Sequence, residues 1–305
     1  MFTKPTMRLD APWTERNGRF APLKAVVFAG LFLPALWIAW LALSGALEPK
    51  VVTEMIHLTG KWAIRFLLLS LLVTPLMRGA RYPKLIGVRR MIGVAAFAYA
   101  TAHFCLYVVD QAFDLPHVAS EIARRFYLTI GFLAWVGLAA LAATSTDSMI
   151  RRLGPKWRTL HALVYGIGVL ALLHFLVRAK ADVTQPVIMT GFFLTLMLFR
   201  GLLKRGATPF LAAAGAVVLA TPLTALIEAG WYSLVRHIPF TMVWAANFSL
   251  DDGVRPAVYV FAAGVAFTLV AFVRRAPSSE RARGLTATPS LGAATAERGA
   301  AAASE

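Results

Sequence analysis

The chain has 305 residues, of which 58% are hydrophobic and only 15% are charged, and its mean hydropathy is +0.66. This composition excludes a water-soluble globular protein, in which about 25% of the residues are charged. Lysine and arginine outnumber aspartate and glutamate by 31 to 15, and because these basic residues gather between apolar runs, they indicate membrane topology rather than nucleic-acid binding.

Eight apolar segments are long enough to cross a hydrocarbon core of about 30 Å as helices. They predict an all-α integral membrane protein. No internal repeat is evident in the amino-acid sequence. In chain order, the predicted spans are 25–45, 62–77, 90–109, 126–144, 160–177, 187–203, 209–227 and 256–273.

The connections between the spans share the basic residues unevenly. The connections on one side, together with both chain ends, hold 22 of these residues, whereas the connections on the other side hold eight. By the positive-inside rule both termini are predicted to be cytoplasmic. The C-terminal segment 276–305 has almost no large apolar residue, so we expect a disordered cytoplasmic tail.

Two histidines lie at matching depth inside the third and fifth spans. Both spans enter from the cytoplasmic side, and His103 and His174 lie about 20 Å along them. An ionisable residue at this depth is a functional hypothesis by default, and two imidazoles at one height are what a six-coordinate haem iron requires. The alternative is that each histidine hydrogen-bonds a neighbouring helix. Small residues that would admit a flat macrocycle are Ala96, Ala100, Gly166 and Ala171.

His161 lies 13 residues before His174, roughly 140° away around a straight helix, so the two cannot bind one iron. His161 could instead ligate a second haem, contact an electron donor or reach water. No histidine of the third span faces it, so a second bis-histidine haem is not supported. We interpret His57 as a polar residue before the second span, and His117 and His237 as loop residues.

Two other polar residues have simpler interpretations. The single cysteine, Cys105, excludes an intramolecular disulfide, a zinc site built on cysteines and a thiolate-held iron–sulfur cluster. Glu228, at the end of the seventh span, is predicted to be interfacial. We predict no catalytic residue in this chain.

Several motifs resemble those of the MsrQ (formerly YedZ) family, the haem-binding membrane subunits of periplasmic methionine-sulfoxide reductases, within the ferric-reductase-like transmembrane superfamily. The resemblance covers about residues 25–203. The motifs are His57-Leu-Thr-Gly-Lys-Trp-Ala, Leu71-Leu-Val-Thr-Pro75-Leu, Arg89-Arg90-Met-Ile-Gly93 leading to His103, Thr144-Ser-Thr-Asp147, Arg151-Arg-Leu-Gly-Pro-Lys-Trp157-Arg-Thr-Leu-His161, Val164-Tyr165, His174-Phe and Lys180-Ala-Asp182.

The resemblance implies a b-type haem, with the membrane histidines of the family at His103, His161 and His174. It also implies a bound FMN and an inner-membrane location. Electrons would pass from the quinone pool to a periplasmic molybdopterin subunit, MsrP, which reduces methionine sulfoxide in oxidised proteins. On this interpretation the chain is the electron-transfer subunit of an oxidoreductase complex.

The predicted domains follow from the composition of the chain ends, the predicted spans and this resemblance. They are a polar leader (1–24), a haem-binding six-helix core (25–203), two additional spans with a periplasmic loop (204–275) and the tail (276–305). The two additional spans exceed the usual core of the family, and we assign them no role.

A basic and aromatic set at the cytoplasmic side is the candidate site for a flavin phosphate or a quinone headgroup. Its members are Arg78, Arg89, Arg90, Trp157 and Arg158, beside His161. Topology alone also explains basic residues there. Two other functions stay open. One is the membrane subunit of a ferric or other metal reductase, against which we count the absence of an appended flavin and nicotinamide module. The other is a transporter without a redox role.

Overall fold

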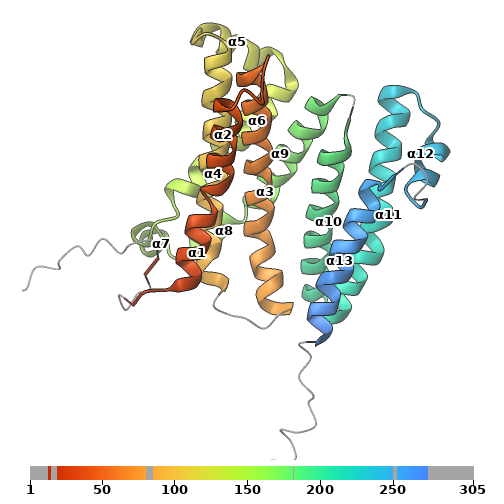
Figure 1. Cartoon of the computed structure of the whole chain (residues 1–305). Helices are drawn as coiled ribbons and strands as arrows, with labels where there is room; N and C mark the ends of the chain where they lie inside the picture. The colour runs from red at the N-terminus through yellow and green to blue at the C-terminus, as the bar shows by residue number, and fades with distance from the viewer. Residues whose placement is uncertain (1–12, 15–18, 80–84, 181, 250–252, 274–305) are drawn as a thin grey trace, which may run out of the picture.

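The computed structural model describes residues 13–14, 19–79, 85–180, 182–249 and 253–273. In these ranges eight helical segments are long and apolar enough to cross a membrane, which confirms the predicted all-α membrane fold. The helices are α1 (Pro22–Gly30), α2 (Leu33–Leu43), α3 (Val51–Gly79), α4 (Ile86–Asp110), α5 (Leu115–Arg124), α6 (Phe126–Ala143), α7 (Asp147–Leu153), α8 (Pro155–His161), α9 (Val164–Ala179), α10 (Thr184–Lys204), α11 (Pro209–Arg236), α12 (Phe240–Ala246) and α13 (Pro256–Val273) (Figure 1).

Two spans differ most from the predicted bounds. Helix α3 begins at Val51, well before the predicted residue 62, and α11 continues to Arg236, past the predicted residue 227. His57 and Glu228 therefore lie inside helices, and both interpretations of them as residues at span ends were wrong. The predicted tail (276–305) and most of the predicted leader (1–24) fall outside the described residues.

Helices α3, α4, α6 and α9 form the central bundle. Each packs against the next, α3 on α4, α4 on α6, α6 on α9 and α9 on α3, so α4 and α9 stand diagonally opposite. Helices α3 and α6 run away from the end of the bundle that carries α5, and α4 and α9 run back towards it (Figure 1). We call this end the α5 end, and the opposite one, which carries α7, the α7 end.

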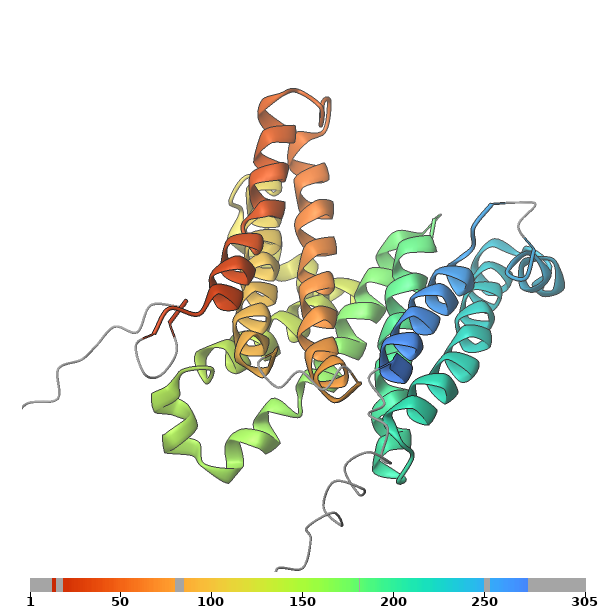
Figure 2. The same cartoon turned by 60° about the horizontal axis from the view of Figure 1, so that its bottom comes forward.

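The last helices form a separate layer beside the bundle. Helix α10 contacts α3 and α9 on one side and α11 and α13 on the other (Figure 2). The approach is close at Gly191, where an added Cβ would lie 2.5 Å from side-chain atoms of both Thr224 and Val260. A glycine is needed there because any side chain would separate α10 from α11 and α13.

Two interruptions of the helical hydrogen bonding are completed by side chains from neighbouring helices. Between α1 and α2, the Tyr99 hydroxyl donates to the Leu31 carbonyl (2.8 Å) and accepts from the Ala35 N–H (2.9 Å). These two backbone groups would pair directly in an unbroken helix. In α3, Pro75 has no N–H for the Leu71 carbonyl, and the Arg200 guanidinium of α10 donates to that carbonyl instead.

Candidate functional site

A cavity of about 470 Å³ lies inside the central bundle, and His103 and His174 both line it. We call it the histidine cavity. His103 comes from α4 and His174 from α9, the two diagonal helices, and their ring centroids are 6.3 Å apart with the planes at 83°. The structure thus brings together the two histidines that the sequence places at matching depth. Most of the remaining wall is apolar, as at Ile64, Leu67 and Phe132.

Each imidazole is held by a backbone carbonyl of a neighbouring helix. His103 Nδ1 lies 2.7 Å from the Ile56 oxygen of α3, and His174 Nδ1 lies 2.7 Å from the Tyr127 oxygen of α6. A carbonyl only accepts, so Nδ1 of each ring carries the proton and donates it. The Nε2 atom of each ring therefore keeps its lone pair, which is how metal-binding histidines are oriented in proteins.

Glycines make room for both rings. A Cβ added at Gly60 would lie 2.9 Å from His103 Nδ1, and one at Gly131 would lie 2.6 Å from His174 Nδ1. Sequence reasoning missed both glycines, because each faces a residue that is 43 positions away along the chain.

The small residues that the sequence suggested contribute unevenly to the cavity. Ala100 and Ala171 line it, whereas Ala96 is buried in the core cluster and the space next to Gly166 is open. Only two of the four suggested residues therefore border the space in which a flat macrocycle would lie.

The two halves of the histidine cavity are built in the same way. The first half consists of Ile56, Gly60 and His103, and the equivalent residues 71 positions later are Tyr127, Gly131 and His174. In each half, 47 residues separate the histidine from the residue whose carbonyl holds it. The hairpins α3–α4 and α6–α9 are thus structural equivalents. The sequence shows no evident repeat because few of the flanking letters match.

A second cavity, of about 770 Å³, lies towards the α7 end, and we call it the basic cavity. Four of the five residues predicted for an anionic or quinone ligand line it, and Arg78 does not. Its polar lining residues are Ser70, Arg89, Arg90, Ser145, Asp147, Trp157, Arg158, His161 and Tyr165, with Thr14 and Lys24 from the N-terminal segment. His161 therefore belongs to this cavity and is separated from His103 and His174.

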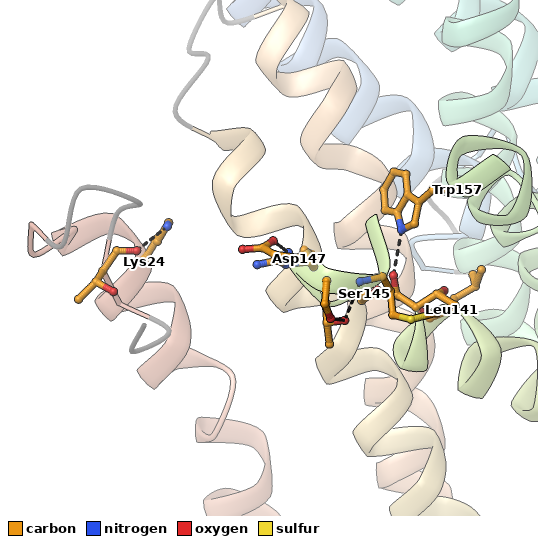
Figure 3. Close-up of polar contacts among 11 residues, drawn as sticks. Lys24, Leu141, Ser145, Asp147 and Trp157 are labelled. Carbon is orange, nitrogen blue, oxygen red and sulfur yellow. Dashed lines mark hydrogen bonds and ion pairs between the residues drawn. The ribbon is translucent and has the colours of Figure 1, made fainter. Parts of the chain in front are cut away.

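The wall of the basic cavity is held by polar contacts. The Trp157 ring stacks on His161 with centroids 3.9 Å apart. Trp157 Nε1 donates to the Thr144 carbonyl at 2.9 Å, which is the dashed line drawn from the labelled Trp157 in Figure 3. His161 Nε2 lies 3.1 Å from the Thr144 hydroxyl. Arg90 forms an ion pair with Asp147 at the start of α7. The cavity thus presents an aromatic surface beside more cationic than anionic side chains, which suits a planar ligand with a negatively charged group.

Leu67 and Leu138 line both cavities. These two leucines are 71 positions apart, the same offset that relates the two histidines, and they are 3% and 7% exposed. They form a buried apolar partition between the histidine cavity and the basic cavity.

Titratable and charged residues that the sequence analysis did not assign to a site lie at the α5 end of the histidine cavity: His57, Lys61, Asp110, Arg178 and Asp182. His57 Nε2 lies 3.4 Å from an Arg178 guanidinium nitrogen. Asp182 lies between two spans, where hydrogen bonds from Thr184 lower the pKa of its carboxyl group. The sequence signals were the motif from His57 to Ala63, which contains Lys61, and the motif Lys180-Ala-Asp182.

Glu228 lies outside both cavities and is fully buried in α11. It accepts a hydrogen bond from Asn247 Nδ2 at 2.6 Å and pairs with Arg255 at 3.4 Å. Glu228 was predicted as an interfacial residue without a partner, whereas the connection between α11 and α13 supplies partners that allow its carboxylate to be buried.

Known proteins are similar to the central part of the sequence. Residues 59–173 match the family described as ferric reductase like transmembrane component. The protein-methionine-sulfoxide reductase heme-binding subunit MsrQ of Klebsiella pneumoniae is 41% identical over 172 residues, which cover 56% of this chain and 86% of that protein. The MsrQ subunit of Salmonella arizonae is 40% identical, over 55% of this chain and 86% of that protein. The MsrQ subunit of Salmonella newport is also 40% identical, over 58% of this chain and 90% of that protein.

No solved structure matches the chain. The sequence identity of 40–41% nevertheless extends over most of the length of each relative. The matched family is also the one that the sequence motifs predicted. The resemblance is thereby confirmed, and the chain belongs to the MsrQ family, within the ferric-reductase-like transmembrane superfamily.

Proposed function

We propose that the chain is a membrane-bound b-type cytochrome, with haem iron held between His103 and His174, that delivers electrons to a methionine-sulfoxide reductase. The observation that carries this proposal is the pair of imidazoles in one mostly apolar cavity, each with Nδ1 fixed on a carbonyl and with its Nε2 lone pair available. Haem supplies reversible one-electron chemistry, and the protein tunes it through axial ligation and burial.

The dimensions of the site support the ligand assignment. Imidazole–metal bonds of about 2 Å on both sides of an iron put the two Nε2 atoms about 4 Å apart and the ring centroids roughly 6 Å apart. The observed centroid separation is 6.3 Å. Gly60 and Gly131 let each ring lie against its carbonyl, which sets the direction in which each lone pair is presented.

The basic cavity is the candidate donor site. Arg89, Arg158 and Lys24 would bind a flavin phosphate or the polar headgroup of a quinone, and Trp157 with His161 would contact its ring system. FMN fits this chemistry, as does a quinone from the respiratory pool. The partition of Leu67 and Leu138 would keep water and protons of the donor site away from the haem.

The charge distribution supports the direction of transfer. The α7 end carries the connections that are rich in lysine and arginine, so we place it, with both termini, at the cytoplasmic face of the inner membrane. The histidine cavity then lies towards the periplasm, close to where a periplasmic molybdopterin subunit, MsrP, would accept electrons. The MsrQ relatives are named as heme-binding subunits of protein-methionine-sulfoxide reductases, which favours this acceptor over a metal ion.

The decisive experiment is a reduced-minus-oxidised absorption spectrum of the purified full-length chain, with its haem content per chain. We expect sharp bis-imidazole bands, lost in both His103→Ala and His174→Ala. His117→Ala on the exposed helix α5 is the control, because His117 lines neither cavity. His161→Ala should keep the bis-imidazole bands and slow reduction by quinol or reduced flavin. Normal haem content in both of the first two variants would refute the ligand assignment.

A further inference from the structure

Two cationic side chains line the α5 end of the histidine cavity. Lys61 extends from α3, and Arg178 from the last turn of the neighbouring helix α9. Lys61 follows Gly60, the glycine that contacts the His103 ring, and Arg178 lies one turn after His174. Each cation is therefore attached to the same helical segment as one wall of the imidazole site.

Neither cation forms an ion pair with a carboxylate in the part of the chain that the structure describes. The side-chain contact of Arg178 is with His57, at 3.4 Å. The two carboxylates of the lining have other hydrogen-bond donors: Asp182 accepts from the Thr184 N–H at 2.9 Å, and Asp110 from Gln111 at 3.1 Å. Lys61 acts on Asp182 only through its charge, as the smallest of the influences that lower the pKa of this carboxyl group. Charged groups at the edge of an apolar cavity are costly unless they bind an opposite charge.

The charged lining residues of the histidine cavity all lie towards the α5 end, and the wall beyond the imidazoles is apolar down to Leu67 and Leu138. A haem is an apolar plate with two carboxylates, the propionates, on one edge. That edge can be accommodated only where donors replace its hydration. The distribution of charge in the cavity thus matches the distribution of charge on the ligand.

We propose that Lys61 and Arg178 bind the two haem propionates and so fix the rotation of the haem about the axis between His103 and His174. This inference rests on the proposed function, because it assigns the carboxylate subsite of the same haem. Both are positioning residues, and His57 supports Arg178. The propionate edge then faces the α5 end, the side assigned to the electron acceptor.

The test compares haem with haem dimethyl ester, in which both propionates are neutral. Full-length apoprotein is loaded with either compound, and the rate of loss to an excess of a haem-scavenging protein is measured for the parent chain, Lys61→Met, Arg178→Met and the double variant. Lys50→Met is the matched control, because Lys50 precedes α3 at the same end and does not line the cavity.

We expect the double variant to lose haem at least roughly tenfold faster than the parent chain, the size of effect that lost charge-assisted hydrogen bonds produce. Its bis-imidazole spectrum should persist, which shows that the fold and the iron ligands are intact. The parent chain should lose the ester as fast as the double variant loses haem, and the substitutions should leave ester loss unchanged. Lys61→Arg should restore slow loss.

Two results would overturn the inference while leaving the proposed function in place. One is equally slow loss of haem and its ester from the parent chain, and the other is faster loss of the ester in the variants, which would indicate a merely structural role. A parent chain that binds no haem, or whose spectrum survives in His103→Ala and His174→Ala, would instead refute the proposed function.

Discussion

Gly60 and Gly131 determine whether the two imidazoles can lie against their carbonyls. Both rings are in contact with a helix backbone at the point where any other residue would place a Cβ, at 2.9 Å from His103 and 2.6 Å from His174. Atoms at these distances overlap, so an alanine must displace the imidazole or the helix. The direction of each Nε2 lone pair thus depends on a residue that binds no ligand itself.

We predict that Gly131→Ala weakens haem binding on the order of tenfold or more, and Gly60→Ala somewhat less, because overpacking costs about 1–3 kcal/mol. Haem content and the bis-imidazole spectrum measure the effect. Gly93→Ala on α4 and Gly166→Ala before the midpoint of α9 are controls, since nothing lies within 4 Å of a Cβ added at either position. Parental haem retention in Gly131→Ala would contradict the assignment.

At the residue scale, the sequence predicted the depth of His103 and His174 because a helix rises by a fixed 1.5 Å per residue. It also placed His161 apart from them, and the structure puts His161 in the basic cavity. The predicted angle around one straight helix was not the reason, because α8 ends at His161 and α9 begins at Val164. Gly60, Gly131 and Lys61 could not be predicted in the same way. Their roles depend on contacts between helices, which a single sequence does not specify.

Helices α3 and α10 are joined by a hydrogen bond to a backbone carbonyl of α3 that Pro75 leaves without its helical donor. Pro75 leaves the Leu71 carbonyl without its helical donor, and Arg200 supplies one from α10. The same guanidinium lies 5.7 Å from the centroid of the Tyr165 ring. A buried carbonyl without a donor is expensive in an apolar surrounding, so Arg200 stabilises the contact between the bundle and the last helices.

We expect Arg200→Met to lower the free energy of unfolding by about 1–3 kcal/mol, the cost of an unsatisfied buried acceptor. In a Pro75→Ala background the alanine N–H can donate to the Leu71 carbonyl, so the same substitution should cost less. Denaturant unfolding of the four chains in detergent gives the coupling energy. An equal cost in both backgrounds would show that the interaction of Arg200 with the Tyr165 ring, rather than the carbonyl, dominates.

The number and order of the spans were predictable because long apolar runs have one stable structure in a bilayer. The bounds of α3 and α11 were not, because a count of apolar residues ends a span at its first charges. Glu228 remains inside α11 since Asn247 and Arg255, 19 and 27 residues later, supply its partners. Lys61 remains inside α3 since it lines a cavity instead of facing lipid.

The whole molecule is organised as two cavities along the axis of one bundle. The 71-residue offset relates the two cavity histidines, their glycines, their carbonyls and the two partition leucines Leu67 and Leu138. At the α7 end the equivalence is broken, because the counterpart of His161 is Arg90, which pairs with Asp147. One end of the bundle is thus suited to symmetric axial ligation and the other to an asymmetric ligand with negative charge.

The partition predicts how solvent reaches the haem. Replacing Leu67 and Leu138 together by alanine would join the histidine cavity to the polar basic cavity and admit water. Water stabilises the more highly charged ferric state, so we expect the midpoint potential of the haem to fall. A redox titration of the purified double variant measures this shift, and its bis-imidazole spectrum shows that His103 and His174 are still in place.

Leu69→Ala on α3 and Leu133→Ala on α6 are the matched controls, because these leucines belong to the same two helices but are 42% and 52% exposed on the outer surface. They should leave the potential unchanged. If the partition double variant kept the parental potential while binding haem normally, water would be excluded by other residues. Leu67 and Leu138 would then be ordinary core residues, and the two cavities would not be coupled through them.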